Sequence, residues 1–188
     1  ERGFTRSGRI YLAGRYDIWE DSYDDNGSLI PHESRVPEPI VYYNNVKAPP
    51  EMFEASQRMA ADWSEPFDET VAFLQNKSIE QVRSELEAAG KGSGMFQIRE
   101  NDCNPQNIAS YAEQQGLLDV VDRIAGSRDR VTRANVEQVC AAVQAEELRQ
   151  GKTLDPEIAE ASGRELAFTW QRKGDLRYSI SNYVNQLQ

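Results

Sequence analysis

Histidine and cysteine are scarce in this sequence, which has one histidine and two cysteines among its 188 residues. Structural zinc takes four nitrogen or sulfur ligands at close spacing, and two cysteines by themselves do not supply them. A serine or cysteine nucleophile needs a nearby base, usually a histidine, and the sequence holds no G-x-S-x-G motif. His32-Glu33 begins like the zinc motif H-E-x-x-H, but Val36 stands in the place of the second histidine. We therefore predict no zinc ligand and no catalytic residue in this chain.

Long hydrophobic runs and an excess of positive charge are also missing. No apolar run approaches the roughly 20 residues that a membrane helix needs, so we predict no membrane span. The 31 acidic residues outnumber the 21 basic ones, which makes the formal net charge -10. An acidic surface repels phosphate backbones, and no stripe of lysine or arginine interleaves with aromatic residues here. Nucleic acid is therefore excluded as a partner.

The patterns that are present predict a fold of the α+β class. Segments 39–43, 95–98 and 176–184 are short runs that alternate or are rich in β-branched and aromatic residues, as β-strands are. A weaker alternation over 4–19 predicts one or two further short strands. Helical periodicity and capping signals lie between the strands. The expected helices cover 52–74, 78–89, 105–115, 117–125, 133–149 and 155–171.

The first of these helices is the longest, and Pro49-Pro50 opens it because proline is tolerated in a first turn. Pro66 is expected to kink or restart it. Ser78 begins a capping box for the second helix, and Thr132 and Asp155 are candidate N-caps further on. The apolar-leaning face of the long helix is predicted from residues at helical spacing, namely Met52, Ser56, Met59, Trp63 and Phe67.

One loop has the spacing of a calcium site. With Gly27 as the sixth position of an EF-hand loop, Asp24 and Asn26 fall at the third and fifth positions, and Glu33 falls at the twelfth. Ser22 at the first position breaks the pattern, and no flanking helices are predicted. A solvated hairpin turn at Asn26-Gly27 explains the same residues, because both tolerate positive φ. Calcium through Asp24, Asn26 and Glu33 is thus a weak candidate.

The two cysteines, Cys103 and Cys140, leave two alternatives open. They can form one long-range disulfide, whose loop closure is worth roughly 3–4 kcal/mol in the chain-entropy model. They can equally be two separate buried thiols.

The chain is expected to be organised in four segments. Residues 1–38 form an extended or β-hairpin segment, and 39–98 hold the first strand and helices of a sheet domain. Residues 99–173 form an acidic helical insertion, and 174–188 return to the sheet as a strand. A strand at a chain end leaves an open edge or an unfilled sheet position. We therefore expect the fold to be incomplete without further sequence.

Five short motifs stand out along the chain. The G-D-L-R-Y motif at 174–178 is the most specific of the five. The others, in chain order, are R-Y-D-I-W at 15–19, P-I-V-Y-Y at 39–43, A-D-W at 61–63 and R-E-N-D-C-N at 99–104. Together they resemble the motifs of large, secreted or surface-attached bacterial zinc-dependent metalloproteases of the myxobacterial kind, which are zincin-like or metzincin-like. The resemblance covers most of the chain, and the acidic helices after residue 105 are its least characteristic part.

The resemblance implies a zincin-like mixed sheet with a long packed helix and a helical insertion. In that family the G-D-L-R-Y strand precedes further strands and then the zinc-binding helix, so the zinc of the parent protein would be bound outside this chain. The implied role is a non-catalytic N-terminal scaffold, whose partners are the C-terminal remainder and a protein or peptide substrate. The resemblance also implies secretion or cell-surface attachment, which favours a disulfide between Cys103 and Cys140.

A different class of function stays open. The strand at 176–184 could accept a partner strand by β-augmentation, which would make the chain an extracellular binding or assembly module. The two hypotheses differ in which chain segment pairs with that strand. A segment of the same gene product favours the peptidase, and a foreign chain or further copies favour the module.

Overall fold

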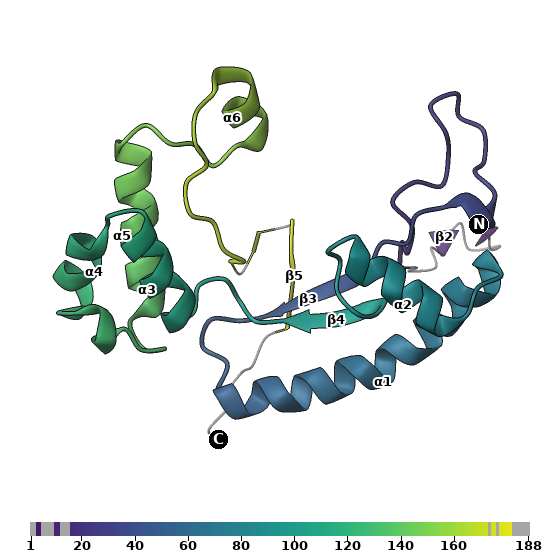
Figure 1. Cartoon of the computed structure of the whole chain (residues 1–188), viewed down its shortest axis with the longest axis horizontal. Coiled ribbons are helices and arrows are strands. Elements are labelled where there is room, and N and C mark those ends of the chain that lie inside the picture. Colours follow the sequence, from purple (N-terminus) through teal and green to yellow (C-terminus); the bar gives the residue numbers. More distant parts are fainter. Residues whose placement is uncertain (1–2, 5–9, 12–15, 173, 176, 182–188) are drawn as a thin grey trace. The chain divides into compact units, whose positions relative to one another are not determined.

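The computed structural model describes residues 3–4, 10–11, 16–172, 174–175 and 177–181 (Figure 1). It confirms the α+β class. The helices are α1 (Pro50–Gln75), α2 (Ile79–Ala88), α3 (Pro105–Gln114), α4 (Leu118–Ala125), α5 (Val136–Arg149) and α6 (Pro156–Ser162). The strands are β1 (Gly3–Phe4), β2 (Ile10–Tyr11), β3 (Ile40–Asn44), β4 (Phe96–Arg99) and β5 (Ser179–Ser181). Short 3-10 helices cover His32–Ser34 and Arg128–Arg130.

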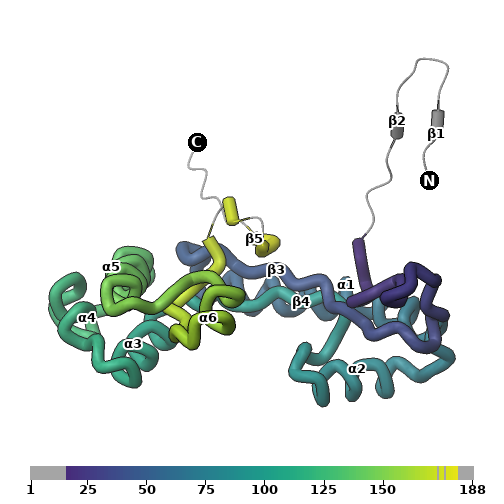
Figure 2. The backbone as a smooth tube through the Cα atoms, turned by 90° about the horizontal axis from the view of Figure 1, so that it is seen from above, coloured from purple at the N-terminus to yellow at the C-terminus, as the bar shows by residue number. Residues whose placement is uncertain are grey.

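The strands of the described residues form two small sheets. Strands β1 and β2 make an antiparallel pair, and the other sheet has the order β4-β3-β5. Strand β5 runs parallel to β3, with Tyr43 opposite Ile180 and Asn44 opposite Ser181. Strands β3 and β4 lie side by side in both views (Figures 1 and 2). The chain divides into two compact units, of which the first contains residues 1–40 and 59–97 and the second contains 41–58 and 98–188.

The core of the first unit forms between the C-terminal part of α1, helix α2 and the residue before β4. Ser78 caps α2 with the predicted capping box, its side chain accepting from Gln81 N while the Gln81 side chain accepts from Ser78 N. Helix α1 continues through Pro66, so of the two expectations for this proline the restart is wrong. The buried hydrophobic residues of this core are Trp19, Val71, Ala72, Val82, Leu86 and Met95.

The buried face of α1 is not the predicted one. Met52, Met59 and Trp63 are 40%, 45% and 55% exposed. The residues buried instead are Ala60, Ser64, Asp68, Val71, Ala72 and Gln75. Gly94 lies so close to this face that a Cβ added to it would collide with the Ser64 hydroxyl, so small residues are needed at this contact. Phe67 of the predicted face stacks on Phe96, at 6.3 Å between ring centroids.

A buried carboxylate organises that same face. Asp68 is completely buried and accepts hydrogen bonds from Met95 N at 2.8 Å and from Ser64 Oγ at 3.2 Å. Arg83 of α2 donates to it from Nε at 2.8 Å and forms an ion pair through Nη2 at 2.7 Å. Because a buried carboxylate is costly unless it is paired and hydrogen-bonded, this arrangement makes α1, α2 and β4 interdependent.

The second unit has its core among α3, α4 and α5, which gather together in Figure 1. Asn104 caps α3, and Gly126 ends α4 in the left-handed conformation at φ 84°. Cys103 and Cys140 form a disulfide inside this core, with their Cα atoms 6.1 Å apart. The disulfide alternative is thereby confirmed.

Two predicted helix boundaries in this unit are wrong. Helix α5 starts at Val136 rather than 133, and Thr132 is not its N-cap, because Thr132 N instead donates to the Asn135 side chain at 2.8 Å. The helix expected over 155–171 is capped by Asp155 as predicted but ends at Ser162, where Gly163 adopts φ 66°. Residues 164–172 are not helical, and they bury Phe168 and Trp170 against the helical core.

The predicted returning strand is described from residue 177 to residue 181. Of these residues Ser179–Ser181 form β5, while Arg177 and Tyr178 belong to a turn. Residues 176 and 182–184 of that prediction lie outside the described residues. None of the helices in the described part of the chain is long and apolar enough to cross a membrane.

Candidate functional site

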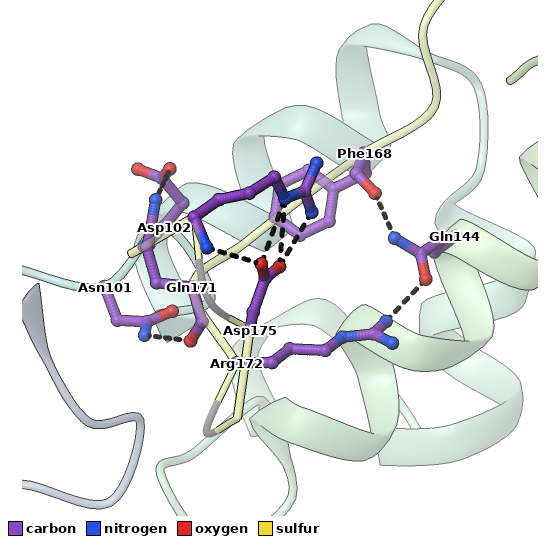
Figure 3. Close-up of polar contacts among 8 residues, drawn as sticks. Asn101, Asp102, Gln144, Phe168, Gln171, Arg172 and Asp175 are labelled. Atoms are coloured by element: carbon purple, nitrogen blue, oxygen red, sulfur yellow. Dashed lines mark hydrogen bonds and ion pairs between the residues drawn. The ribbon is translucent and has the colours of Figure 1, made fainter. Parts of the chain in front are cut away.

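A set of polar contacts in the second unit surrounds the segment that leads into β5. It joins the loop after β4, helix α5, residues 168–172 and the pair Asp175 and Arg177 (Figure 3). We call this set the polar cluster. Its members are Asn101, Asp102, Gln144, Gln171, Arg172, Asp175 and Arg177.

Asn101 is the most buried member, with 2% of its surface exposed. Its Nδ2 donates to Gln171 O at 2.7 Å and to Asn44 O at 3.2 Å. Its Oδ1 accepts from Cys103 N at 3.0 Å. A single side chain therefore ties the end of β3, the loop that carries the disulfide and the approach to β5.

Two glutamines complete this connection. Gln171 exchanges two hydrogen bonds with Asp102, accepting from Asp102 N at 3.0 Å and donating to Asp102 Oδ2 at 2.7 Å. Gln144 of α5 donates to Phe168 O at 2.6 Å and accepts from Arg172. The Arg172 guanidinium also lies over the Trp170 ring, 3.7 Å from its centroid, at a distance typical of a cation–π contact.

Asp175 and Arg177 form the charged end of the cluster, within the G-D-L-R-Y motif. Arg177 Nη2 lies 2.7 Å from Asp175 Oδ2, and Arg177 N donates to Oδ1 at 3.1 Å. Hydrogen bonds from the Arg177 side chain and backbone lower the pKa of Asp175 to about 2. These two residues shape the turn before β5, and Tyr178 then meets Tyr43 of β3 edge to face at 5.7 Å.

A second buried carboxylate bonds to the chain just before the cluster residue Gln171. Glu147 is completely buried and accepts from Phe168 N at 2.6 Å, from Tyr111 Oη at 2.6 Å and from Lys152 Nζ at 2.8 Å. Burial first, and then the hydrogen bond to Glu147, raise the pKa of Tyr111. Glu147 thus fixes the backbone of Phe168 just ahead of Gln171.

The polar cluster can hold the main chain in place where it leads into β5. The Asp102 and Asp175 carboxylates both accept hydrogen bonds from neighbouring side chains, so the cluster is built from groups that satisfy one another. Within the described part of the chain, no group of three or more His, Cys, Asp or Glu side chains is placed to hold a metal ion.

The calcium candidates are distributed over a turn and a 3-10 helix. Asp24 Oδ1 accepts from Asn26 N at 3.0 Å and from Ser28 N at 2.8 Å, and Gly27 has φ 77°. Tyr23 bridges antiparallel to Leu29, which confirms the hairpin turn. Glu33 lies in the 3-10 helix His32–Ser34. Calcium binding by these residues stays a prediction, and a higher melting temperature in excess calcium would support it.

Only part of the polar cluster lies in motifs that stand out in the sequence. Asn101 and Asp102 lie in the R-E-N-D-C-N motif, and Asp175 and Arg177 lie in the G-D-L-R-Y motif. Gln144 and Gln171 were missed, because a lone glutamine in a predicted helix has no local signal that it is buried. Comparisons of the chain with protein-family models, with curated proteins and with solved structures gave no match.

Proposed function

We propose that this chain is the non-catalytic N-terminal scaffold of a secreted zinc metallopeptidase, and that the zinc-binding helix lies outside it. The proposal rests on the resemblance of the five motifs to bacterial zinc-dependent metalloproteases. Its parent protein would hydrolyse proteins or peptides, and zinc would be bound by residues that follow this chain.

One spatial relationship carries the proposal. The P-I-V-Y-Y and G-D-L-R-Y motifs are far apart in sequence. Nevertheless β3, which contains most of the first motif, pairs in parallel with β5, which directly follows the second motif. Asn101 of the R-E-N-D-C-N motif donates to the carbonyl groups of Asn44, which directly follows the first of these motifs, and of Gln171, which lies three positions before the second. Three of the five motifs therefore serve one framework, as expected if they specify a common scaffold.

The disulfide supports the secreted part of the proposal. Disulfides persist in oxidising compartments and are rare in the cytosol, so the Cys103–Cys140 bond is compatible with export.

The test compares two purified proteins, this chain alone and the gene product that includes the residues encoded after Gln188. The longer protein is expected to contain one zinc per molecule and to hydrolyse a denatured protein substrate, with activity lost on chelation. The chain alone is expected to do neither. A longer protein without zinc and without peptidase activity, or a peptidase activity of the chain alone, would refute the proposal.

A second function is favoured by the position of β5. In the sheet order β4-β3-β5 this strand is at the edge, with no further strand beside it among the residues that the structure describes. An open edge presents unpaired N–H and C=O groups to a partner strand. Concentration-dependent assembly of the longer protein, measured by light scattering and lost when Ile180 is replaced by proline, would favour the assembly module over the peptidase.

A further inference from the structure

Two Asn-x-Ser sequences in the first unit have no part in the proposed scaffold role. They are Asn26-Gly27-Ser28 and Asn76-Lys77-Ser78. An asparagine two positions before a serine, with any residue except proline between them, is the acceptor sequence for N-linked glycans in exported proteins. Both asparagines are exposed, so exposure alone does not distinguish the two sequences.

The first sequence forms the tip of a hairpin whose hydrogen bonds are local. Gly27 N donates to Asp24 O at 2.8 Å, and Asp24 N donates to Ser28 O at 2.9 Å. Asp24 Oδ1 accepts from Asn26 N at 3.0 Å and from Ser28 N at 2.8 Å. None of these four bonds uses the side chain of Asn26 or Ser28, so both side chains of the acceptor sequence project from the turn without holding it together.

The base of this hairpin is also exposed. Tyr23 and Leu29, which bridge there, are 61% and 62% exposed. Segments with few buried apolar contacts and with exposed hydrogen bonds open locally at a low free energy. An enzyme can therefore take up residues 24–28 in another backbone conformation while the core of the first unit stays folded.

The second sequence is held between two helices. Lys77 N donates to Ala72 O at 2.9 Å at the end of α1, and Lys77 Nζ lies 2.6 Å from Glu85. Ser78 Oγ accepts from Gln81 N at 3.2 Å, and Ser78 N donates to Gln81 Oε1 at 2.9 Å, which together form the capping box of α2. Drawing this sequence into an enzyme would uncap α2, so the folded chain presents the first sequence and not the second.

The residues two positions ahead of the asparagines differ in charge. Asp24 places an exposed carboxylate before Asn26, whereas Leu74 stands at the corresponding position before Asn76. A cationic side chain of a transferring enzyme can pair with the carboxylate and has no such partner at Leu74. Charge and backbone accessibility thus favour the same asparagine.

We propose that Asn26 carries an N-linked oligosaccharide and that Asn76 does not. The donor is an oligosaccharide joined to a lipid through a diphosphate. A bond forms between Asn26 Nδ2 and the anomeric carbon of the first sugar, while the bond from that carbon to the diphosphate oxygen breaks. The lipid diphosphate leaves with the electron pair, and Nδ2 loses one proton to a base of the enzyme. The proposal rests on the secreted part of the proposed function, because this acceptor sequence is used in exported proteins.

The first experiment isolates the longer protein from the cells that encode it, after export. Peptide mass spectrometry with electron-transfer fragmentation is expected to find on Asn26 an added mass equal to a sum of sugar residues. The same measurement is expected to find Asn76 unmodified. An exported protein with an unmodified Asn26 would overturn the proposal, and so would a glycan on Asn76.

Variants of the longer protein test the acceptor sequence. Ser28→Ala keeps the asparagine and removes the hydroxyl group that the sequence requires, so complete loss of the glycan is expected. Ser28→Thr retains a hydroxyl group and is expected to retain the glycan. Asn76→Gln is the matched control and should leave the glycan unchanged. Melting temperatures show that each variant is folded, and a glycan that persists in Ser28→Ala would overturn the proposal.

These outcomes are distinct from those of the zinc and peptidase tests. An exported peptidase whose Asn26 is unmodified would overturn only the glycan. A protein retained in the cytosol would overturn both the glycan and the secreted part of the proposed function. A glycan on Asn26 of an exported protein without zinc would support the glycan while refuting the peptidase.

Discussion

Asn101 donates a hydrogen bond from Nδ2 to the main-chain oxygen of Gln171, 70 positions later in the sequence, at 2.7 Å. Because the same Nδ2 also donates to Asn44 O, the loop after β4 connects the end of β3 with the segment that leads into β5. The pairing of β5 with β3 therefore depends on one buried amide as well as on the strands' own hydrogen bonds.

Asn101→Asp is expected to lower the free energy of unfolding by about 3 kcal/mol or more, because two buried carbonyl groups lose their donor and a carboxylate is buried in its place. Urea unfolding followed by circular dichroism measures this. Asn107→Asp is the control, since Asn107 is exposed and its substitution removes a single exposed hydrogen bond, to Asp102 O, so its effect should stay within about 1 kcal/mol. Similar losses in both variants would contradict the role given to Asn101.

Loss of the Cys103–Cys140 disulfide should lower the free energy of unfolding by about 3–4 kcal/mol, as the chain-entropy model gives for a bridge over 37 positions. The double variant Cys103→Ser and Cys140→Ser is compared with the wild-type protein by guanidinium unfolding. Adding reductant should weaken the wild-type protein and leave the double variant unchanged. An equal effect of reductant on both would show that the bond is not the source of the stabilisation.

Arg83→Met is expected to cost about 3 kcal/mol, because it leaves the completely buried Asp68 without its cation. The matched control is Arg58→Met, whose partner Glu54 lies 4.0 Å away with both side chains exposed. Exposed ion pairs contribute little, so the control should change stability by less than about 0.5 kcal/mol. Thermal unfolding of both variants checks this, and a near-neutral Arg83→Met would refute the interdependence of α1, α2 and β4.

The pH dependence of the turn before β5 follows from Asp175. Its pKa in the folded protein is about 2, below the ordinary 3.8, mainly because Arg177 donates hydrogen bonds to the carboxylate. The unfolded chain then binds more protons between these two values, so the stabilisation by this pair is present above about pH 4 and lost as the pH falls toward 2.

Carboxyl NMR titration tests this assignment. Arg177→Gln should return the pKa of Asp175 toward 3.8, while Arg172→Gln, which removes a smaller and more distant contribution, should raise it much less. Equal shifts in the two variants would contradict the assignment to Arg177.

Local signals in the sequence determined much of the secondary structure. The capping box at Ser78, the N-cap at Asp155 and the turn at Asn26-Gly27 depend on neighbours within a few residues, and each is present in the structure. The short β-branched run at 39–43 predicted β3 for the same reason. The two cysteines had only each other as partners within the chain, although the sequence alone could not show whether they were bonded.

Tertiary structure decided which faces are buried. From its apolar character Trp63 was expected to face inward. The carboxylate of Asp68, however, can be buried only where Arg83 and Met95 N reach it, and the adjacent face of α1 is therefore the buried one. Likewise, residues 164–171 have helical composition but are held extended by Glu147, which bonds to Phe168 N, and by Gln144, which bonds to Phe168 O. Buried hydrogen-bond partners distant in sequence outweigh local propensity, because an unpaired buried polar group costs more than an unfavourable local conformation. For that reason the sequence by itself determined most of the elements, and only the fold decided the polar cluster and the buried face of α1.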